Sequence, residues 1–304
     1  MKKTKKIFKV FGIALLVLVG GVGVYGTMIW RGAAGLLEEA HYEITIENLR
    51  ENNEEVRLSR SEPFSILLLG IDRDHPNDRG RSDTMMLVTI NPNTHSTKML
   101  SIARDTKVTI PDRGVTTRIN HAFAYGGPDL AIETVQQYLN VPIDHFAAID
   151  MEGFVNLIDA VGGVTVENDF AFSLEGFTFP QGELHLNGQE ALNYSRMRKQ
   201  DPRGDFGRQN RQRDVLDALV RRLATFAIGN FQSVFDAMEG NLTTSLEMSD
   251  IISISLNYGD ALDEVIQKEM TGHNIRFNGM ALVDVPEEMR QQMEIDLRNH
   301  LELD

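Results

Sequence analysis

The feature that most constrains this chain is an uncharged stretch of 21 residues near its N-terminus, from Val10 to Trp30. A helix of that length can cross the ~30 Å hydrocarbon layer of a membrane. Five lysines precede the stretch, and the first acidic residue is Glu38. Because positive charge before a span favours the cytoplasmic side, residues 1–9 are predicted to be a basic cytoplasmic tail and residues 10–30 a transmembrane helix. The rest of the chain is then expected outside the cell, in a single-pass protein of the cell membrane.

A cleaved signal peptide is the alternative to this anchor. The apolar stretch is longer than the roughly 7–15 residues usual for the core of a signal peptide, and no Ala-x-Ala cleavage site precedes Trp30. Three glycines in the stretch, Gly21, Gly23 and Gly26, match a dinucleotide-binding pattern. That pattern requires a preceding strand and a following helix, so we interpret the glycines as part of the span. The sequence therefore favours an uncleaved anchor.

Charge and cysteine content narrow the function of the outer part. Without the five N-terminal lysines, the remaining 25 basic and 44 acidic residues leave a formal net charge of −19. Such an acidic domain repels phosphates at long range, and no nucleic-acid partner is expected. The chain contains no cysteine, which excludes thiolate catalysis, cysteine zinc sites and disulfides.

The order of apolar and polar segments predicts a fold class. Residues 31–62 are polar and are expected to form a partly helical extracellular stalk, followed by one domain over residues 63–304. A continuous apolar run predicts a buried strand at 65–71, and two further runs predict a hairpin. The expected elements are strands at 85–91, 97–102, 145–150, 164–166 and 274–283, and helices at 120–124, 128–139, 152–160 and 248–258. This alternation predicts an α/β fold with a mixed central β-sheet covered by helices on both sides.

Charged residues recur where the predicted strands begin or end. Asp72 directly follows the first strand and Asp83 precedes the second. Two carboxylates at neighbouring strand ends suit Mg²⁺, which binds one or two protein carboxylates and leaves positions for phosphate oxygens. The alternative is that these aspartates cap turns. Other charged residues share the same edge of the sheet, namely Arg81, Arg104, Asp105 and Arg118.

The most basic stretch of the outer domain runs from 196 to 213. It holds six arginines and one lysine against two aspartates. On a helical wheel, Arg208 and Arg211 share the apolar face with Val215, whereas Arg213 is expected to face solvent. Inward-facing arginines need a bound anion or carboxylates to neutralise them, and guanidinium groups bind phosphate oxygens bidentately. The alternative is an ordinary solvated basic face.

Several short motifs occur in order along the chain. They are Gly70-Ile71-Asp72, Arg81-Ser82-Asp83, Ser101-Ile102-Ala103-Arg104-Asp105, Arg118-Ile119-Asn120-His121, Gly162-Gly163-Val164, Tyr194-Ser195-Arg196-Met197-Arg198 and Gly204-Asp205-Phe206-Gly207-Arg208-Gln209. Together they resemble the LytR-CpsA-Psr family of Gram-positive bacteria, and within it the LytR-type wall teichoic acid ligases. The resemblance covers residues 63–226, with the anchor and the C-terminal segment also similar. The family usually has Lys where this chain has Arg118.

The resemblance implies a phosphotransferase of cell wall biogenesis. Such an enzyme takes wall teichoic acid, or a similar anionic glycopolymer, from an undecaprenyl diphosphate carrier and joins it through a phosphodiester to the C6 hydroxyl of peptidoglycan muramic acid. Asp72 and Asp83 would hold Mg²⁺, or another divalent cation such as Mn²⁺, and Asp105 would orient an arginine or accept the acceptor's proton. The residues implied to contact the diphosphate are Arg81, Arg104, Arg118, Arg196, Arg198, Arg208 and Arg211.

Two other functions fit the same residues. One is a non-catalytic, membrane-anchored protein that binds lipid-linked wall precursors or regulates their use. The other is a lipid pyrophosphatase that uses water as acceptor. A lipid would also need a path into the domain, and the apolar segments 146–149, 154–158 and 170–179 either line such a tunnel or form an ordinary core.

Overall fold

The computed structural model describes residues 32, 34–51, 54–73, 78–224 and 231–303. Within this part of the chain, no helix is both long enough and apolar enough to cross a membrane. The transmembrane helix predicted at residues 10–30 lies outside the described residues.

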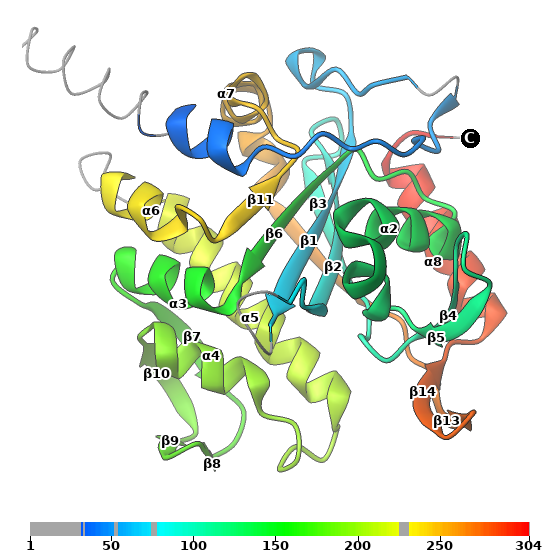
Figure 1. The fold of residues 1–304 in the computed structure, drawn as a ribbon. Helices are drawn as coiled ribbons and strands as arrows, with labels where there is room; N and C mark the ends of the chain where they lie inside the picture. Colours follow the sequence, from blue (N-terminus) through cyan, green and yellow to red (C-terminus); the bar gives the residue numbers. More distant parts are fainter. Residues whose placement is uncertain (1–31, 33, 52–53, 74–77, 225–230, 304) are drawn as a thin grey trace, which may run out of the picture.

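A six-stranded mixed sheet forms the centre of the fold, in the order β11-β6-β1-β2-β3-β12 (Figure 1). β1 is parallel to β6 and antiparallel to β2, whereas β3 is antiparallel to β2 and parallel to β12. The predicted strands at 65–71, 85–91, 97–102 and 145–150 are confirmed, and the second and third form the expected hairpin. The strands are β1 (Phe64–Asp72), β2 (Arg81–Asn91), β3 (Ser96–Ser101), β6 (His145–Asp150), β11 (Leu242–Thr244) and β12 (Glu264–Glu269).

Helices cover both faces of this sheet (Figure 1). Because side chains alternate along a strand, β1 sends Leu67 and Leu69 into a core beneath α2 and α8, and Leu68 toward Leu216 of α5. The predicted α/β fold, with a mixed sheet between helices, is therefore confirmed. One face carries α2 (His121–Leu139) and α8 (Glu287–His300), and the other carries α3 (Met151–Ala160), α4 (Gly188–Arg196), α5 (Asp205–Ala224) and α6 (Phe231–Met238).

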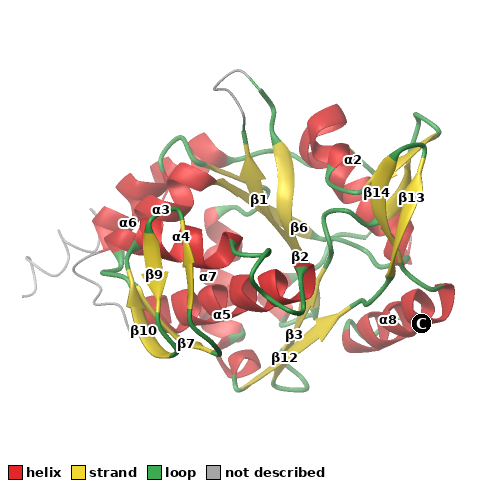
Figure 2. Cartoon of the chain, turned by 90° about the horizontal axis from the view of Figure 1, so that it is seen from below, coloured by secondary structure: helices red, strands yellow, loops and turns green. Residues whose placement is uncertain are grey.

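The C-terminal residues belong to the same sheet. β12 extends it beyond β3, and the buried His300 of α8 shares hydrogen bonds with the hydroxyls of Thr89 at 2.7 Å and Ser96 at 3.0 Å. The strand expected at 274–283 is a hairpin that turns at Asn278 and Gly279, both with positive φ. The described residues form four further two-stranded sheets, labelled in Figure 1, of which β7–β10 and β13–β14 are also seen in Figure 2. They are β4 (Lys107–Ile110) with β5 (Val115–Arg118), β7 (Val164–Asn168) with β10 (Gly182–Leu186), β8 (Phe172–Leu174) with β9 (Phe177–Phe179), and β13 (His273–Phe277) with β14 (Met280–Asp284).

Residues 40–51 and 54–62 lie along the domain, which differs from the separate stalk that we expected. His41 forms a β-bridge with Thr244 of β11, and the largely buried Arg50 pairs with Asp144 at 2.6 Å. Apolar side chains at alternate positions of the segment pack against the core, namely Tyr42, Ile44 and Ile46. This alternation is typical of an extended segment with one buried face, and the polar residues that alternate with it, Glu43, Thr45 and Glu47, concealed it.

The two helices predicted at 120–124 and 128–139 are confirmed as the two parts of helix α2, which has a kink between them. Gly127 interrupts it with a φ of +71°, in a region that glycine adopts readily. Pro128 follows and starts the second part, where its missing N–H costs least. The first part of α2 lies beside β2, because Asn120, immediately before the helix, donates a hydrogen bond to Asp83 at 2.9 Å.

Candidate active site

A cavity of about 990 Å³ lies between the sheet and helices α3, α4 and α5. Pockets for small ligands measure roughly 300–1,000 Å³, so this cavity has room for a bulky apolar group. Much of its wall is apolar and comes from both the strands and the helices, with Leu68, Met86, Ile149, Phe154, Leu157, Leu192, Leu216 and Leu219 among the lining residues.

The three apolar segments that the sequence assigned to a tunnel or a core are divided between the two. Some of their side chains line the cavity, namely Ala147, Ile149, Phe154, Leu157, Leu174 and Phe177. Others are buried in the core, namely Phe146, Ile158, Phe172 and Phe179. Sequence alone could not separate these groups, because both consist of apolar residues at similar spacing.

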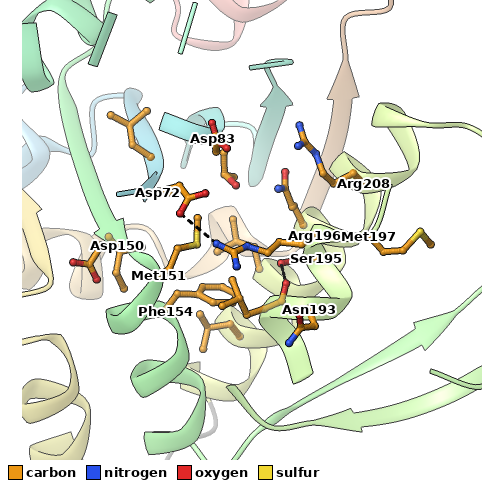
Figure 3. A pocket seen from close by; sticks show the side chains of 18 of the residues that line it. Asp72, Asp83, Asp150, Met151, Phe154, Asn193, Ser195, Arg196, Met197 and Arg208 are labelled. Carbon is orange, nitrogen blue, oxygen red and sulfur yellow. Dashed lines mark hydrogen bonds and ion pairs between the residues drawn. The ribbon is translucent and has the colours of Figure 1, made fainter. Parts of the chain in front are cut away.

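Charged side chains gather where the cavity opens to solvent (Figure 3). Asp72 ends β1 and Arg196 ends α4; their side chains are 40% and 44% exposed and form an ion pair at 3.3 Å. We call this part of the cavity the polar mouth, and it consists of Asp72, Asp83, Arg104, Arg196, Arg198, Lys199 and Arg208. Five of these seven side chains are basic, although Asp150 and Glu175 also line the cavity. The basic side chains of the mouth can bind an anion in an otherwise acidic domain.

A β-bulge sets the direction of Asp83. Gly70 pairs with Thr84 and the next residue, Ile71, pairs with Ser82, so Asp83 is the extra residue in β2. Bulges of this kind redirect a side chain and are common beside active sites. The Asp83 carboxylate accepts hydrogen bonds from Arg104, just after β3, and from Asn120, just before α2. Asn120 was part of a sequence motif, but we had assigned it no role.

Helix α4 delivers Arg196 to the mouth. It begins with a capping box, in which Asn187 and Glu190 satisfy each other's backbone N–H groups. A Cβ added at Gly188 would lie 2.2 Å from the carbonyl oxygen of Val155 in α3, so only glycine permits this close approach of the two helices. This close packing at the start of α4 fixes the position of the helix, and Arg196 at its other end lies opposite Asp72.

The N-terminal part of α5 carries the arginines that the helical wheel singled out. Arg208 is 6% exposed and lines the cavity, as predicted. Arg211 is also buried, but it lies behind the mouth, where its Nη1 pairs with Asp201 at 2.7 Å and its guanidinium lies over the Phe172 ring. Arg211 is not among the residues that line the cavity, and these contacts suit a positioning role, so its contact with the diphosphate stays a prediction. The helical wheel was compatible with a carboxylate as the neutralising group of Arg211, and Asp201 is that carboxylate.

Asp201 holds the loop between α4 and α5 in place. Its side chain is fully buried and accepts hydrogen bonds from Arg211 and Arg203. Burial alone would raise the pKa of Asp201, but these hydrogen bonds outweigh it and lower the pKa to about 2. A Cβ at Gly207 would lie 1.8 Å from the Asp201 carboxylate, so α5 must present glycine there. The same loop brings Arg198 to the mouth.

Arg213 contradicts the prediction that it faces solvent. It is 5% exposed, and its guanidinium donates to Ser101 at 3.0 Å and to Gln267 at 3.2 Å. These partners lie on β3 and β12, so Arg213 fastens α5 to the sheet. The wheel treated the polar side of α5 as solvated, because it could not show that strand β12, distant in sequence, packs there.

The remaining predicted residues form a group beside the mouth. Arg81, Asp105 and Arg118 are not among the residues that line the cavity. Arg118 pairs with Asp105 at 3.2 Å, which is the arginine-orienting contact expected of Asp105. Burial first, then the positive charges of Arg118 and Arg81, lower the pKa of His121, so this histidine lies among them.

No group of three or more His, Cys, Asp or Glu side chains in the described residues has the geometry of a metal site. The two carboxylates predicted to hold Mg²⁺, Asp72 and Asp83, do line the same cavity. Mg²⁺ commonly takes one or two protein carboxylates together with substrate phosphates. The donors in the mouth are therefore suited to a magnesium ion that arrives with a phosphate ligand.

Fold and site together define an α/β protein with an apolar cavity and an arginine-rich, carboxylate-containing mouth, suited to a ligand with an apolar part and an anionic group. The chain belongs to the LytR_cpsA_psr family, which it matches over residues 36–299.

Two curated relatives share the full length of the chain. The polyisoprenyl-teichoic acid--peptidoglycan teichoic acid transferase TagU of Bacillus cereus is 41% identical over 304 residues, covering 99% of both chains. TagU of Bacillus subtilis is 38% identical over 302 residues, covering 96% of this chain and 97% of its own. A solved structure of TagT bound to LIIa-WTA superposes with a TM-score of 0.72 at 29% identity, covering 86% of this chain and 99% of TagT.

Proposed function

We propose that this protein is a teichoic acid transferase of cell wall biogenesis. It moves wall teichoic acid, or a similar anionic glycopolymer, from an undecaprenyl diphosphate carrier to the C6 hydroxyl of peptidoglycan muramic acid. The relatives named as polyisoprenyl-teichoic acid--peptidoglycan teichoic acid transferases support the transferase role. The observation that carries the proposal is the basic mouth on an apolar cavity, which matches a ligand that has a diphosphate at the end of a long hydrocarbon.

The cavity and its mouth divide the binding of such a donor. The apolar wall binds a portion of the polyisoprenyl chain, because burying apolar surface is favourable by about 25 cal/mol per Å². Arg104, Arg196, Arg198 and Arg208 then surround the diphosphate. The Asp72–Arg196 and Asp83–Arg104 pairs hold two guanidinium groups in place before the donor binds, so little ordering is needed on binding.

The transfer step exchanges the phosphoanhydride bond of the diphosphate for a phosphodiester bond. The acceptor oxygen bonds to the phosphorus that carries the glycopolymer, the bridging P–O bond of the diphosphate breaks, and undecaprenyl phosphate leaves with the electron pair. The acceptor's proton passes to a base, for which Asp105 is our candidate. Phosphoryl transfer depends mainly on positioning and on neutralising charge, and the arginines of the mouth supply both.

We further propose that Asp72 and Asp83 hold Mg²⁺ when the donor is bound, with Mn²⁺ as an alternative. Bound there, the ion would neutralise charge on the diphosphate oxygens. Transfer is then expected to stop on addition of a chelator and to resume when Mg²⁺ is added back. Transfer that is unaffected by chelation would exclude the metal from the mechanism.

We also propose that residues 10–30 anchor the protein in the cell membrane and that the domain lies outside the cell. The support is the run of lysines before an uncharged stretch. Protease added to intact protoplasts should remove the domain and leave a small membrane-bound fragment. Protection of the whole chain would contradict this location.

The function is tested by following a glycopolymer label from the lipid-linked donor in the presence of peptidoglycan. A transferase attaches the label to peptidoglycan. A pyrophosphatase releases the label as free polymer phosphate, and a binding protein leaves it on the lipid, so either of these results would refute the proposal.

A further inference from the structure

Two arginines and a tyrosine lie together around the first part of α2, whose second part carries the carboxylates Asp129 and Glu133. Tyr125 is 37% exposed, and the guanidinium of Arg113 lies 5.0 Å from the centre of its ring. Both Arg113 and Arg79 donate hydrogen bonds to the carbonyl oxygen of Tyr125, at 3.0 Å and 3.3 Å. One exposed arginine thus lies over an exposed aromatic ring, and a second binds the backbone carbonyl of the same residue. We call Arg79, Arg113 and Tyr125 the α2 surface.

The α2 surface is continuous with the site. The rings of Tyr125 and His121 lie 5.7 Å apart. His121 in turn follows Asn120, which donates to Asp83 in the mouth, and it lies within the field of Arg118 and Asp105. A ligand on the α2 surface would therefore lie next to Asp83 of the mouth and to the Asp105–Arg118 pair beside it.

The position of the surface relative to the cavity suits an attacking group. In phosphoryl transfer, the attacking and leaving oxygens lie roughly in line on opposite sides of the phosphorus. The leaving lipid phosphate stays on the cavity side, toward α3, α4 and α5. Helix α2 and the β4–β5 hairpin lie on the other side of the ends of β1 and β2 (Figure 1), which is the side from which an acceptor hydroxyl must come.

We propose that the α2 surface binds the acceptor, a peptidoglycan strand whose stem peptides carry carboxylates. This inference rests on the proposed function and names the site of its second substrate. Guanidinium groups bind carboxylates through charge-assisted, often bidentate hydrogen bonds, and the flat face of Tyr125 offers apolar contact area to a sugar ring. Arg79 and Arg113 would therefore hold the peptide carboxylates while the muramic acid hydroxyl reaches the mouth.

The kinetic test uses Tyr125→Ala and Arg113→Ala in the full-length protein. Loss of one charge-assisted or aromatic contact should raise the KM for a peptidoglycan fragment about tenfold, with kcat and the KM for the lipid-linked donor unchanged. Arg60→Ala and Leu256→Ala are matched controls: both side chains are exposed, and they lie in η2 (Leu58–Arg60) and α7 (Met248–Asn257). These two elements contact each other near the start of β1, whereas the polar mouth lies at the end of β1.

A rise in the donor KM instead of the acceptor KM would mean that the α2 surface binds the donor polymer, and it would overturn the proposal. So would unchanged kinetics in both variants. Arg113→Lys keeps the charge but loses the planar guanidinium, and it should recover part of the acceptor affinity.

A binding measurement separates this inference from the proposed function, because it needs no transfer. Purified peptidoglycan strands are sedimented with the wild-type protein, before and after chemical amidation of the stem carboxylates. Amidation should weaken binding by the wild type about tenfold and have a smaller effect on the Arg113→Ala variant, which keeps only Arg79 to bind a carboxylate. Equal binding of both forms by the wild type would overturn the carboxylate recognition. Carboxylate-dependent binding without transfer would refute the proposed function and leave the surface assigned to peptidoglycan.

Discussion

Replacing Asp201 with Asn removes a buried charge from the loop that carries Arg198 to the polar mouth. The Asp201 side chain is fully buried, and that of Arg211, 2.7 Å away, is 4% exposed. The variant leaves Arg211 buried without its counter-charge, and breaking a buried ion pair in this way costs about 3–5 kcal/mol. For a domain of this size each kcal/mol lowers the midpoint of thermal unfolding by about 2–4 °C. The expected decrease is therefore about 6–20 °C.

The pH dependence makes this prediction more specific. The folded-state pKa of Asp201 is about 2, below the value of about 3.9 for an unfolded chain. A carboxyl group with a depressed folded-state pKa contributes stability that is fully present above the unfolded value and is lost as the pH falls through the folded value. The difference in unfolding free energy between wild type and variant should therefore be constant at neutral pH and shrink as the pH falls from about 4 toward 2.

Urea denaturation of the full-length protein across this pH range measures the difference directly. Asp169→Asn is the matched control, because Asp169 pairs with the same Arg203 at 3.2 Å but is 69% exposed. Removing such an exposed partner should cost at most about 1 kcal/mol. A loss for Asp201→Asn as small as that of the control, or one that does not change with pH, would refute our assignment of Asp201 and Arg211 as the pair that positions the loop.

Three further predictions follow from buried side chains around the site and the sheet. Arg213→Ala should lower the free energy of unfolding by about 2–3 kcal/mol, as read from the urea midpoint, because it loses charged hydrogen bonds to Ser101 and Gln267. Arg208→Ala should reduce kcat/KM for transfer by ~30-fold to ~1000-fold, and Arg208→Lys should recover part of it, because Arg208 lines the mouth. Burial lowers the pKa of His300 to about 4, so wild-type stability should fall as the pH drops from about 6.5 to about 4, by at most ~1.4 kcal/mol per pH unit, and His300→Asn should lose this dependence.

Controls for these variants use exposed residues. Arg221→Ala removes an arginine from the same helix as Arg213, but its side chain is 74% exposed, and its effect on stability should be near zero. If Arg213→Ala changed the free energy of unfolding as little as Arg221→Ala, the Arg213 contacts between α5 and the sheet would not contribute to stability. Unchanged transfer in Arg208→Ala would place the diphosphate elsewhere. If the unfolding free energy of His300→Asn depended on pH as that of the wild type does, the loss of stability at acidic pH would not come from His300.

Local patterns predicted the four inner strands of the sheet, β6, β1, β2 and β3, because each carries its own signal, but they missed the edge strands β11 and β12. The apolar run after Phe64 and the turn between β2 and β3 are encoded within a few residues. The inward face of Arg208 could also be predicted, since helical periodicity places it with Val215. These features depend on contacts that lie close together in the sequence.

Features that depend on distant segments could not be predicted in this way. Arg213 is buried because β12, more than 50 residues later, packs on its side of α5. Arg211 is neutralised by Asp201 across a loop, and the wheel contained no information about that loop. Residues 40–51 and 54–62 pack along the domain through partners such as Asp144 and Thr244. The cavity could not be predicted for the same reason. Its lining residues are apolar, as core residues are, and only the placement of the helices in space distinguishes the two.

The central claim is that the polar mouth cuts the donor between its two phosphates. It can be measured with two donors of the same lipid-linked glycopolymer, one labelled in the phosphate attached to the polymer and one in the phosphate attached to the lipid. After reaction with peptidoglycan, we predict the first label in peptidoglycan, in a phosphodiester at the muramic acid C6 oxygen, and the second in undecaprenyl phosphate. Transfer of both labels to peptidoglycan, or of neither, would contradict the account.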